Sequence, residues 1–359
     1  MKYLYALGLL FVFAITKGQT TDTLINVGRY QLHFTIIKGK NTPILFEAGG
    51  GNDGTIWNGL TRYIAEITGA TMITYDRPGL GKSGKDSTDT SIGNDIKGLE
   101  TGLAKLGYQK EIMLVSHSLG GFYNSLYAAR HPGNIKAIVF FDTNLPGFFT
   151  PEQFEKMNAS QHIRNDVETV RKNPLPANIP LLDIVSEKTV FEGTPDADRW
   201  KTVHHDFAAS SPNRKEMIAY ETGHYIFLQN RPLAINAIVT MYANYVMPAQ
   251  KAVILEKAYA QALNADNEDR KSLMNYWHSE SDLNEWAYSF LQKNELPKAL
   301  EIFKLNVLLH PESANVYDSL ADAYLKSGNK ELSIKNYKKA LEIDPGKNSA
   351  KKALEQLLK

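Results

Sequence analysis

The chain has 359 residues, of which 43% are hydrophobic, and its 40 basic and 39 acidic side chains leave a formal net charge of +1. This length allows one large core and a second, smaller unit, so we expect two domains. The balanced charge gives no broad attraction for nucleic acid or anionic membranes, and the lack of cysteine excludes disulfides, thiol nucleophiles and cysteine-based metal sites.

The first 18 residues have the layout of a secretory signal. Lys2 precedes an apolar stretch at 4–15, and Gly18 follows as a cleavage point. The apolar run is shorter than the ~20 residues that span a bilayer. We therefore expect an exported protein, periplasmic or secreted, with no stable membrane anchor after cleavage.

Short apolar runs recur along the first two thirds of the chain. Residues 24–27 and 31–37 predict a hairpin, and further strands are expected at 44–48, 71–75, 112–115, 137–141, 181–185 and 216–220. Helical stretches separate the later runs, which predicts an α/β fold with a mostly parallel sheet and crossover helices. Residues 145–178 interrupt this alternation and predict a small cap.

Residues 112–130 predict a strand, a sharp turn and a helix, with a serine at the turn. A nucleophilic serine at such a turn takes a strained backbone conformation, so the residues two before and two after it must be small. With Ser118 as nucleophile these positions hold Ser116 and Gly120. With Ser116 as nucleophile, Leu114 would crowd the turn. Ser118 is therefore the predicted nucleophile.

Three stretches of the sequence resemble the α/β-hydrolase fold family. The turn resembles G-x-S-x-G with Ser116 in place of the first glycine, residues 46–52 resemble the glycine-rich loop after the third strand, and residues 75–83 closely match the loop after the fourth. The resemblance implies an oxyanion hole of backbone amides, which we assign to Gly50 and Leu119. Asp76 and Arg77 are expected to brace loops near the site.

The same resemblance implies a catalytic histidine and an acid. His224 follows the last expected strand, and the order of serine before histidine is that of this family. Relatives usually hold the acid a few residues after the seventh strand, where this chain has Thr189. We favour Asp142, which ends the sixth strand, because residues at strand ends face the ligand crevice. Glu187 is the alternative acid, and Asp183 ranks third as a core carboxylate that needs a partner.

The aromatic side chains of the cap suggest an apolar acyl or alcohol pocket. Phe148 and Phe149 are expected to line it together with His117, although the same aromatics could simply dock the cap. His204 and His205 are adjacent, so they point to different faces of a helix and do not predict a metal pair. No metal or organic cofactor is expected.

The last part of the chain resembles the tetratricopeptide repeat over about residues 280–347. Like residues recur 34 positions apart, at Phe290 and Tyr324, Ala299 and Ser333, Phe303 and Tyr337, and Pro311 and Pro345. The first copy is degenerate, with Asn294 and Asn306 where the second has Gly328 and Ala340. A capping helix is expected at 350–358, and one or two helices within 249–277. Two repeats are few, so we expect them to dock on the first domain or on another chain.

These observations predict an α/β-hydrolase domain at 19–247 and a helical region at 248–359. The predicted function is an exported serine hydrolase that cleaves an ester or related acyl bond of a small-molecule substrate through Ser118, His224 and Asp142. One alternative is a hydrolase-fold binding or scaffold protein with a weakened triad, whose repeats bind a protein partner. Another is an aminopeptidase-like hydrolase. Nucleic acid is not an expected partner.

Overall fold

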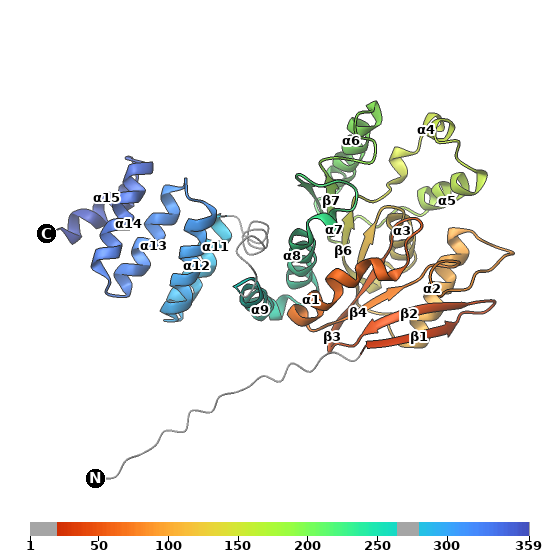
Figure 1. The fold of residues 1–359 in the computed structure, drawn as a ribbon, viewed down its shortest axis with the longest axis horizontal. Helices are drawn as coiled ribbons and strands as arrows, with labels where there is room; N and C mark the ends of the chain where they lie inside the picture. The colour runs from red at the N-terminus through yellow and green to blue at the C-terminus, as the bar shows by residue number, and fades with distance from the viewer. Residues whose placement is uncertain (1–19, 264–279, 359) are drawn as a thin grey trace, which may run out of the picture. The chain divides into compact units, whose positions relative to one another are not determined.

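The computed structural model describes residues 20–263 and 280–358. The predicted signal at 1–18 and part of the helical region predicted at 249–277 lie outside the described residues. Contacts divide the described chain into two units (Figure 1). The first comprises residues 20–229 and 241–248, and the second comprises 230–240, 249–263 and 280–358.

The first unit is built on an eight-stranded sheet with the order β1-β2-β4-β3-β5-β6-β7-β8. The strands are β1 (Thr20–Asn26), β2 (Gln31–Ile37), β3 (Asn41–Glu47), β4 (Ala70–Tyr75), β5 (Ile112–His117), β6 (Ile135–Phe141), β7 (Leu181–Ser186) and β8 (Arg214–Ala219). β2 is antiparallel to β1 and β4, and all other pairs are parallel. The predicted hairpin and mostly parallel sheet are confirmed.

Helices connect the parallel strands. They are α1 (Asn58–Thr68), α2 (Ile92–Leu106), α3 (Gly120–Arg130), α4 (Pro151–Lys156), α5 (Gln161–Lys172) and α6 (Pro195–Ala209), and α7 (Ile226–Gln229) follows the last strand. Every residue of β4, β5 and β7 is buried, as expected for strands that are covered on both faces and therefore read as continuous apolar runs. The expected cap corresponds to α4 and α5, which lie between β6 and β7 in the chain.

The parallel strands place their carboxyl ends at one edge of the sheet. Glu47, His117, Phe141, Ser186 and Ala219 end β3, β5, β6, β7 and β8. Side chains just beyond these ends come from distant parts of the chain but share that edge, which is where ligands bind in open α/β sheets.

The second unit is helical. Its helices are α8 (Arg231–Met241), whose last residue groups with the first unit, α9 (Lys251–Leu263), α11 (Glu280–Gln292), α12 (Leu296–Leu309), α13 (Ala314–Lys326), α14 (Lys330–Ile343) and α15 (Asn348–Leu357). No helix within residues 20–263 or 280–358 combines the length and apolar character that a bilayer span requires.

The two predicted repeats correspond to the helix pairs α11–α12 and α13–α14. Asn294 and Gly328, which occupy equivalent positions, both have left-handed backbones with φ of 61° and 78°. Asparagine tolerates this conformation better than most residues, which explains why the first copy keeps its turn without glycine. Asn306, in place of a small alanine, is buried and donates to the Glu280 carbonyl at 3.0 Å.

Candidate functional site

Ser118 lies at the turn between β5 and α3 with a φ of 51°. This left-handed backbone is strained for a residue with a side chain, so neighbouring structure must hold it. Ser118 N donates to the Phe141 carbonyl at 3.2 Å, and its own carbonyl accepts from Gly121 N at 3.0 Å and Asn144 N at 2.8 Å. These three bonds fix the turn, and the Ser118 side chain is half-buried.

Steric contacts explain the small residues around Ser118. A Cβ atom on Gly120 would lie 2.7 Å from the carbonyl oxygens of Glu47 and Ala48, which real side chains do not tolerate. Ser116 is fully buried, and its hydroxyl has no hydrogen-bond partner among the described residues. Of the two serines, Ser118 is therefore the one whose hydroxyl is partly accessible.

His224 and Asp142 meet at the carboxyl edge of the sheet. Nδ1 of His224 lies 2.7 Å from Oδ2 of Asp142. Asp142 directly follows β6, is fully buried and has a φ of 46°. Its carboxylate also accepts from Ser186 N at 3.2 Å, Ser186 Oγ at 3.0 Å and Trp200 Nε1 at 3.0 Å.

The electrostatics keep Asp142 ionised. Burial alone would raise the pKa of its carboxyl, but the hydrogen bond and charge of His224, together with His204 and Trp200, hold the pKa below its ordinary value. A carboxylate accepts hydrogen bonds only, so Nδ1 of His224 carries the proton in this pair. In the neutral ring, Nε2 is then free to accept a proton.

His117 lies between the elbow and His224. Its ring packs on that of His224 with centroids 4.5 Å apart, and its Nε2 donates to the His224 carbonyl at 3.0 Å. Burial lowers the pKa of His117 to about 3. Only 1% of His117 is exposed in this structure, and its place in the substrate pocket stays a prediction.

The rings of His117 and His224 link the base to the turn, but Ser118 and His224 make no direct bond. Within residues 20–263 and 280–358, Ser118 Oγ has no hydrogen-bond partner. Nucleophile-to-base hydrogen bonds are commonly long without substrate and tighten in the complex.

The glycine-rich loop after β3 packs against the elbow. A Cβ built on Gly49 would lie 3.2 Å from Ser118 Cβ, and one built on Gly50 would lie 3.6 Å from a methyl carbon of Leu119. Among the described residues, the backbone N–H groups of Gly50 and Leu119 donate to no protein acceptor. Two free amides therefore flank the serine.

Arg77 fixes this loop from behind. Its guanidinium donates to the Gly49 carbonyl at 2.5 Å, to the Ala48 carbonyl, and to Glu47 Oε1 at 2.8 Å. Glu47 is fully buried and also accepts from the Tyr75 hydroxyl. Burial raises the pKa of Glu47 to about 7, against the opposing effect of Arg77 and Tyr75.

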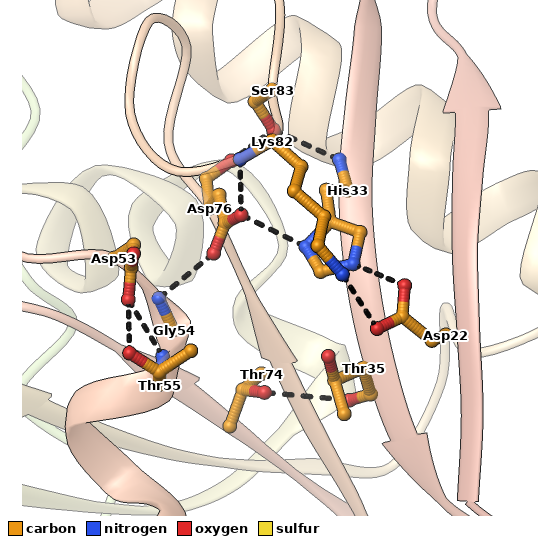
Figure 2. A network of polar contacts seen from close by, with 10 residues as sticks. All are labelled: Asp22, His33, Thr35, Asp53, Gly54, Thr55, Thr74, Asp76, Lys82 and Ser83. Atoms are coloured by element: carbon orange, nitrogen blue, oxygen red, sulfur yellow. Dashed lines mark hydrogen bonds and ion pairs between the residues drawn. The ribbon is translucent and has the colours of Figure 1, made fainter.

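Asp76 ties two loops to β2 (Figure 2). Oδ1 accepts from Gly54 N at 2.9 Å, and Oδ2 accepts from Lys82 N at 2.8 Å and contacts His33 Nδ1 at 2.8 Å. The other ring nitrogen of His33 lies 2.5 Å from Asp22 Oδ1. Asp76 and Arg77 thus occupy bracing positions, as the sequence suggests.

The other candidate acids lie elsewhere. Glu187 Oε2 accepts from Glu221 N at 2.7 Å. Asp183 contacts Nδ1 of His204 at 2.7 Å, and both side chains are fully buried, so this core carboxylate has its partner. His205 instead contacts Glu216 at 2.9 Å. No cluster of His, Asp and Glu suited to a metal ion occurs among the described residues.

Phe148 and Phe149 pack in the core of the inserted segment. Phe148 contacts Trp200 with ring centroids 5.0 Å apart, and Phe149 contacts Phe122 at 5.5 Å. Both are buried. These contacts agree with the alternative in which the two aromatics dock the cap, and their place in a substrate pocket stays a prediction.

Sequence reasoning missed the residues that hold Asp142. Ser186 ends β7 at the same edge of the sheet, so its position was a usable signal. Trp200 lies on α6 and reaches Asp142 from 58 residues away, and no sequence pattern indicates that contact.

Comparisons with known proteins agree with the fold. Residues 42–175 match the α/β-hydrolase fold family and residues 314–347 match the tetratricopeptide repeat. The chain is 27% identical over 196 residues to the uncharacterized protein YqjL of Bacillus subtilis, covering 51% of this chain and 76% of that protein.

Two solved structures are similar to part of this chain. One is a thermophilic esterase from Thermogutta terrifontis, 16% identical with a TM-score of 0.47, for which 64% of this chain and 100% of the other are covered. Another is the α/β-hydrolase domain-containing protein 10 from mouse, 17% identical with a TM-score of 0.48, for which 62% and 99% are covered.

The depressed pKa of His117 predicts a pH-dependent stability. A histidine with a folded pKa near 3 contributes stability above its unfolded pKa of about 6.5, which is lost as the pH falls toward the folded value. The free energy of unfolding, measured by urea titration, should fall from pH 7.5 to pH 5 by about 2 kcal/mol less in His117→Gln than in wild type. His162→Gln, at an exposed position, is the control, and equal pH dependence in His117→Gln and wild type would contradict the prediction.

Proposed function

Because this chain carries an α/β-hydrolase fold, we propose that it is a serine hydrolase that cleaves an ester or a related acyl bond. The observation that carries the proposal is the 2.7 Å contact between His224 Nδ1 and a buried, ionised Asp142, beside a serine in a strained turn. An imidazole held by a carboxylate at one nitrogen presents the other as a general base.

The proposed reaction has two halves. Ser118 Oγ attacks the substrate carbonyl carbon while His224 Nε2 takes the hydroxyl proton, and the tetrahedral adduct then collapses to an acyl-enzyme. The protonated His224 gives that proton to the leaving alcohol. Water, deprotonated by His224, cleaves the acyl-enzyme, releases the carboxylic acid and restores the Ser118 hydroxyl.

Stabilisation of the negatively charged oxygen falls to the two free amides. The N–H groups of Gly50 and Leu119 come from the two segments that pack together beside Ser118. Preorganised donors of this kind cost no reorganisation when charge develops.

Arg77 orients the first of these amides. In a trans peptide, the C=O and the following N–H point in opposite directions. Since the guanidinium holds the Gly49 carbonyl at 2.5 Å, the Gly50 N–H of the same peptide group points away from Arg77. Arg77 is thus a positioning residue for the proposed oxyanion hole.

The proposal also covers the location of the protein and its partners. The segment at 1–18 would direct export to the periplasm or medium, and the repeats would bind a protein partner. A binding or scaffold protein with a weakened triad is the competing function, and the labelling experiment below separates the two.

Fluorophosphonate labelling tests the nucleophile. Wild-type protein should be labelled, and Ser118→Ala and His224→Ala should lose labelling because one lacks the attacking oxygen and the other the base. Ser116→Ala is a matched control, since this serine is fully buried two residues away. An unlabelled wild type would favour the binding protein, whereas labelled Ser118→Ala would move the nucleophile elsewhere.

A pair of amide variants tests the acid. Asp142→Asn should lower kcat by about 10³–10⁴-fold, because the amide does not stabilise the required His224 tautomer and its charged form. Glu187→Gln, at a carboxylate that accepts from the Glu221 amide, should retain turnover. Steady-state ester hydrolysis measures both, and the reverse ranking would assign the acid to Glu187.

Arg77→Lys tests the orientation of the Gly50 amide. An ammonium preserves the charge beside Glu47 but lacks the planar fork that holds two carbonyls, so kcat should fall by about 10²-fold, as for loss of one oxyanion donor. The rate of thionoester hydrolysis depends less on such donors, because sulfur accepts hydrogen bonds weakly. The ester-to-thionoester rate ratio should therefore fall in Arg77→Lys and not in Arg130→Lys, a surface control. An equal loss on both substrates would indicate a purely structural role.

A further inference from the structure

A cavity of about 270 Å³ opens beside the elbow. Its lining includes Gly51, Arg77, Asp86, Asp95, Leu119 and Tyr123. The volume is below the ~300–1,000 Å³ typical of drug-sized ligand pockets, so the cavity suits a short group.

The cavity adjoins the proposed oxyanion hole. Gly51 follows Gly50 in the glycine-rich loop, and Leu119 supplies one of the two free amides. Tyr123 lies one turn further along α3, and its hydroxyl donates to Asp95 Oδ2 at 2.9 Å. One wall therefore runs from Leu119, the residue after Ser118, to the carboxylate of Asp95 on α2.

Asp95 is half-buried and only partly compensated. Its second oxygen, Oδ1, has no hydrogen-bond partner among the described residues. Burial raises the pKa of Asp95 to about 6, in spite of the opposing effects of Tyr123 and Arg77. A carboxylate in this state gains from a positively charged or hydrogen-bond-donating ligand.

The other charges around the cavity have partners or face water. Arg77 pairs with Glu47 at 2.8 Å, and Asp86 pairs with Arg29 at 3.6 Å. His162 contacts Asp166 at 3.3 Å, and Lys85 is exposed. Two carboxylates line the cavity, Asp86 and Asp95. Of these, Asp95 is the one that forms no ion pair with a described residue.

We infer that this cavity is the acyl subsite and that Asp95 selects acyl groups bearing a protonated amine, such as short aminoacyl esters or amides. The inference rests on the proposed function and narrows its substrate class. The substrate ammonium would take the free Oδ1, while the acyl carbonyl reaches the amides of Gly50 and Leu119.

Isosteric pairs of 4-nitrophenyl esters test the inference. Glycyl is compared with propanoyl and β-alanyl with butanoyl, since each pair differs by an ammonium in place of a methyl group. Each kcat/KM is divided by the rate of hydroxide hydrolysis of the same ester, which removes intrinsic reactivity. Wild type should prefer the amino ester of at least one pair.

Asp95→Asn should lower this preference by about 10-fold or more, the effect of losing a charge-assisted hydrogen bond, and mainly through KM. The kcat/KM for the neutral esters should fall by a smaller factor than that for the amino esters, because asparagine can still accept from Tyr123. Asp89→Asn removes an exposed carboxylate outside the cavity lining and should leave the preference unchanged.

Different results would contradict the acyl subsite and the proposed function. If wild type hydrolyses the neutral esters but shows no amino preference, or if Asp95→Asn retains that preference, the subsite is overturned and the proposed function stands. Equal loss on both esters in Asp95→Asn would also overturn it, since a structural role would affect both alike. If wild type hydrolyses neither ester and is not labelled, the proposed function fails as well.

Discussion

The arrangement of the candidate site depends on one buried carboxylate. Asp142 lies at the end of β6 with no exposed surface, and an ionised group in that position is costly unless donors surround it. Four donors do so: Ser186 provides two, and Trp200 and His224 one each. The three donor residues lie at the end of β7, on α6 and in the loop after β8. The carboxylate therefore gathers β7, α6 and the loop after β8 around one point, and the orientation of His224 follows from it.

The sequence was most informative where sterics leave few choices. Ser118 could be chosen over Ser116 because a bulky neighbour cannot fit the turn. The structure shows the cause, since a Cβ on Gly120 would lie 2.7 Å from two carbonyl oxygens. The mostly parallel sheet was predicted from short apolar runs that alternate with helical stretches. Even the degenerate first repeat was recognisable, since Asn294 adopts the left-handed backbone that Gly328 adopts in the second.

Roles set by distant contacts were harder to predict. Asp142 was only one of three candidate acids, because its donors lie 44 or more residues further along the chain. Phe148 and Phe149 have the same sequence pattern whether they line a cavity or fill a core, and the structure buries them. Asp95 belongs to no motif. The sequence does not indicate which of its oxygens has a partner, because the bond from Tyr123 to Oδ2 forms only when α2 and α3 pack together.

The neutral ring of His117 has an energetic consequence for the proposed chemistry. When the base accepts the serine proton, a full positive charge forms about 4.5 Å from that ring. A second cation there would repel it by about 4 kcal/mol at an effective dielectric constant of about 20. Because burial keeps the adjacent imidazole unprotonated, the reaction avoids this repulsion even near pH 5, where an ordinary histidine would carry the charge.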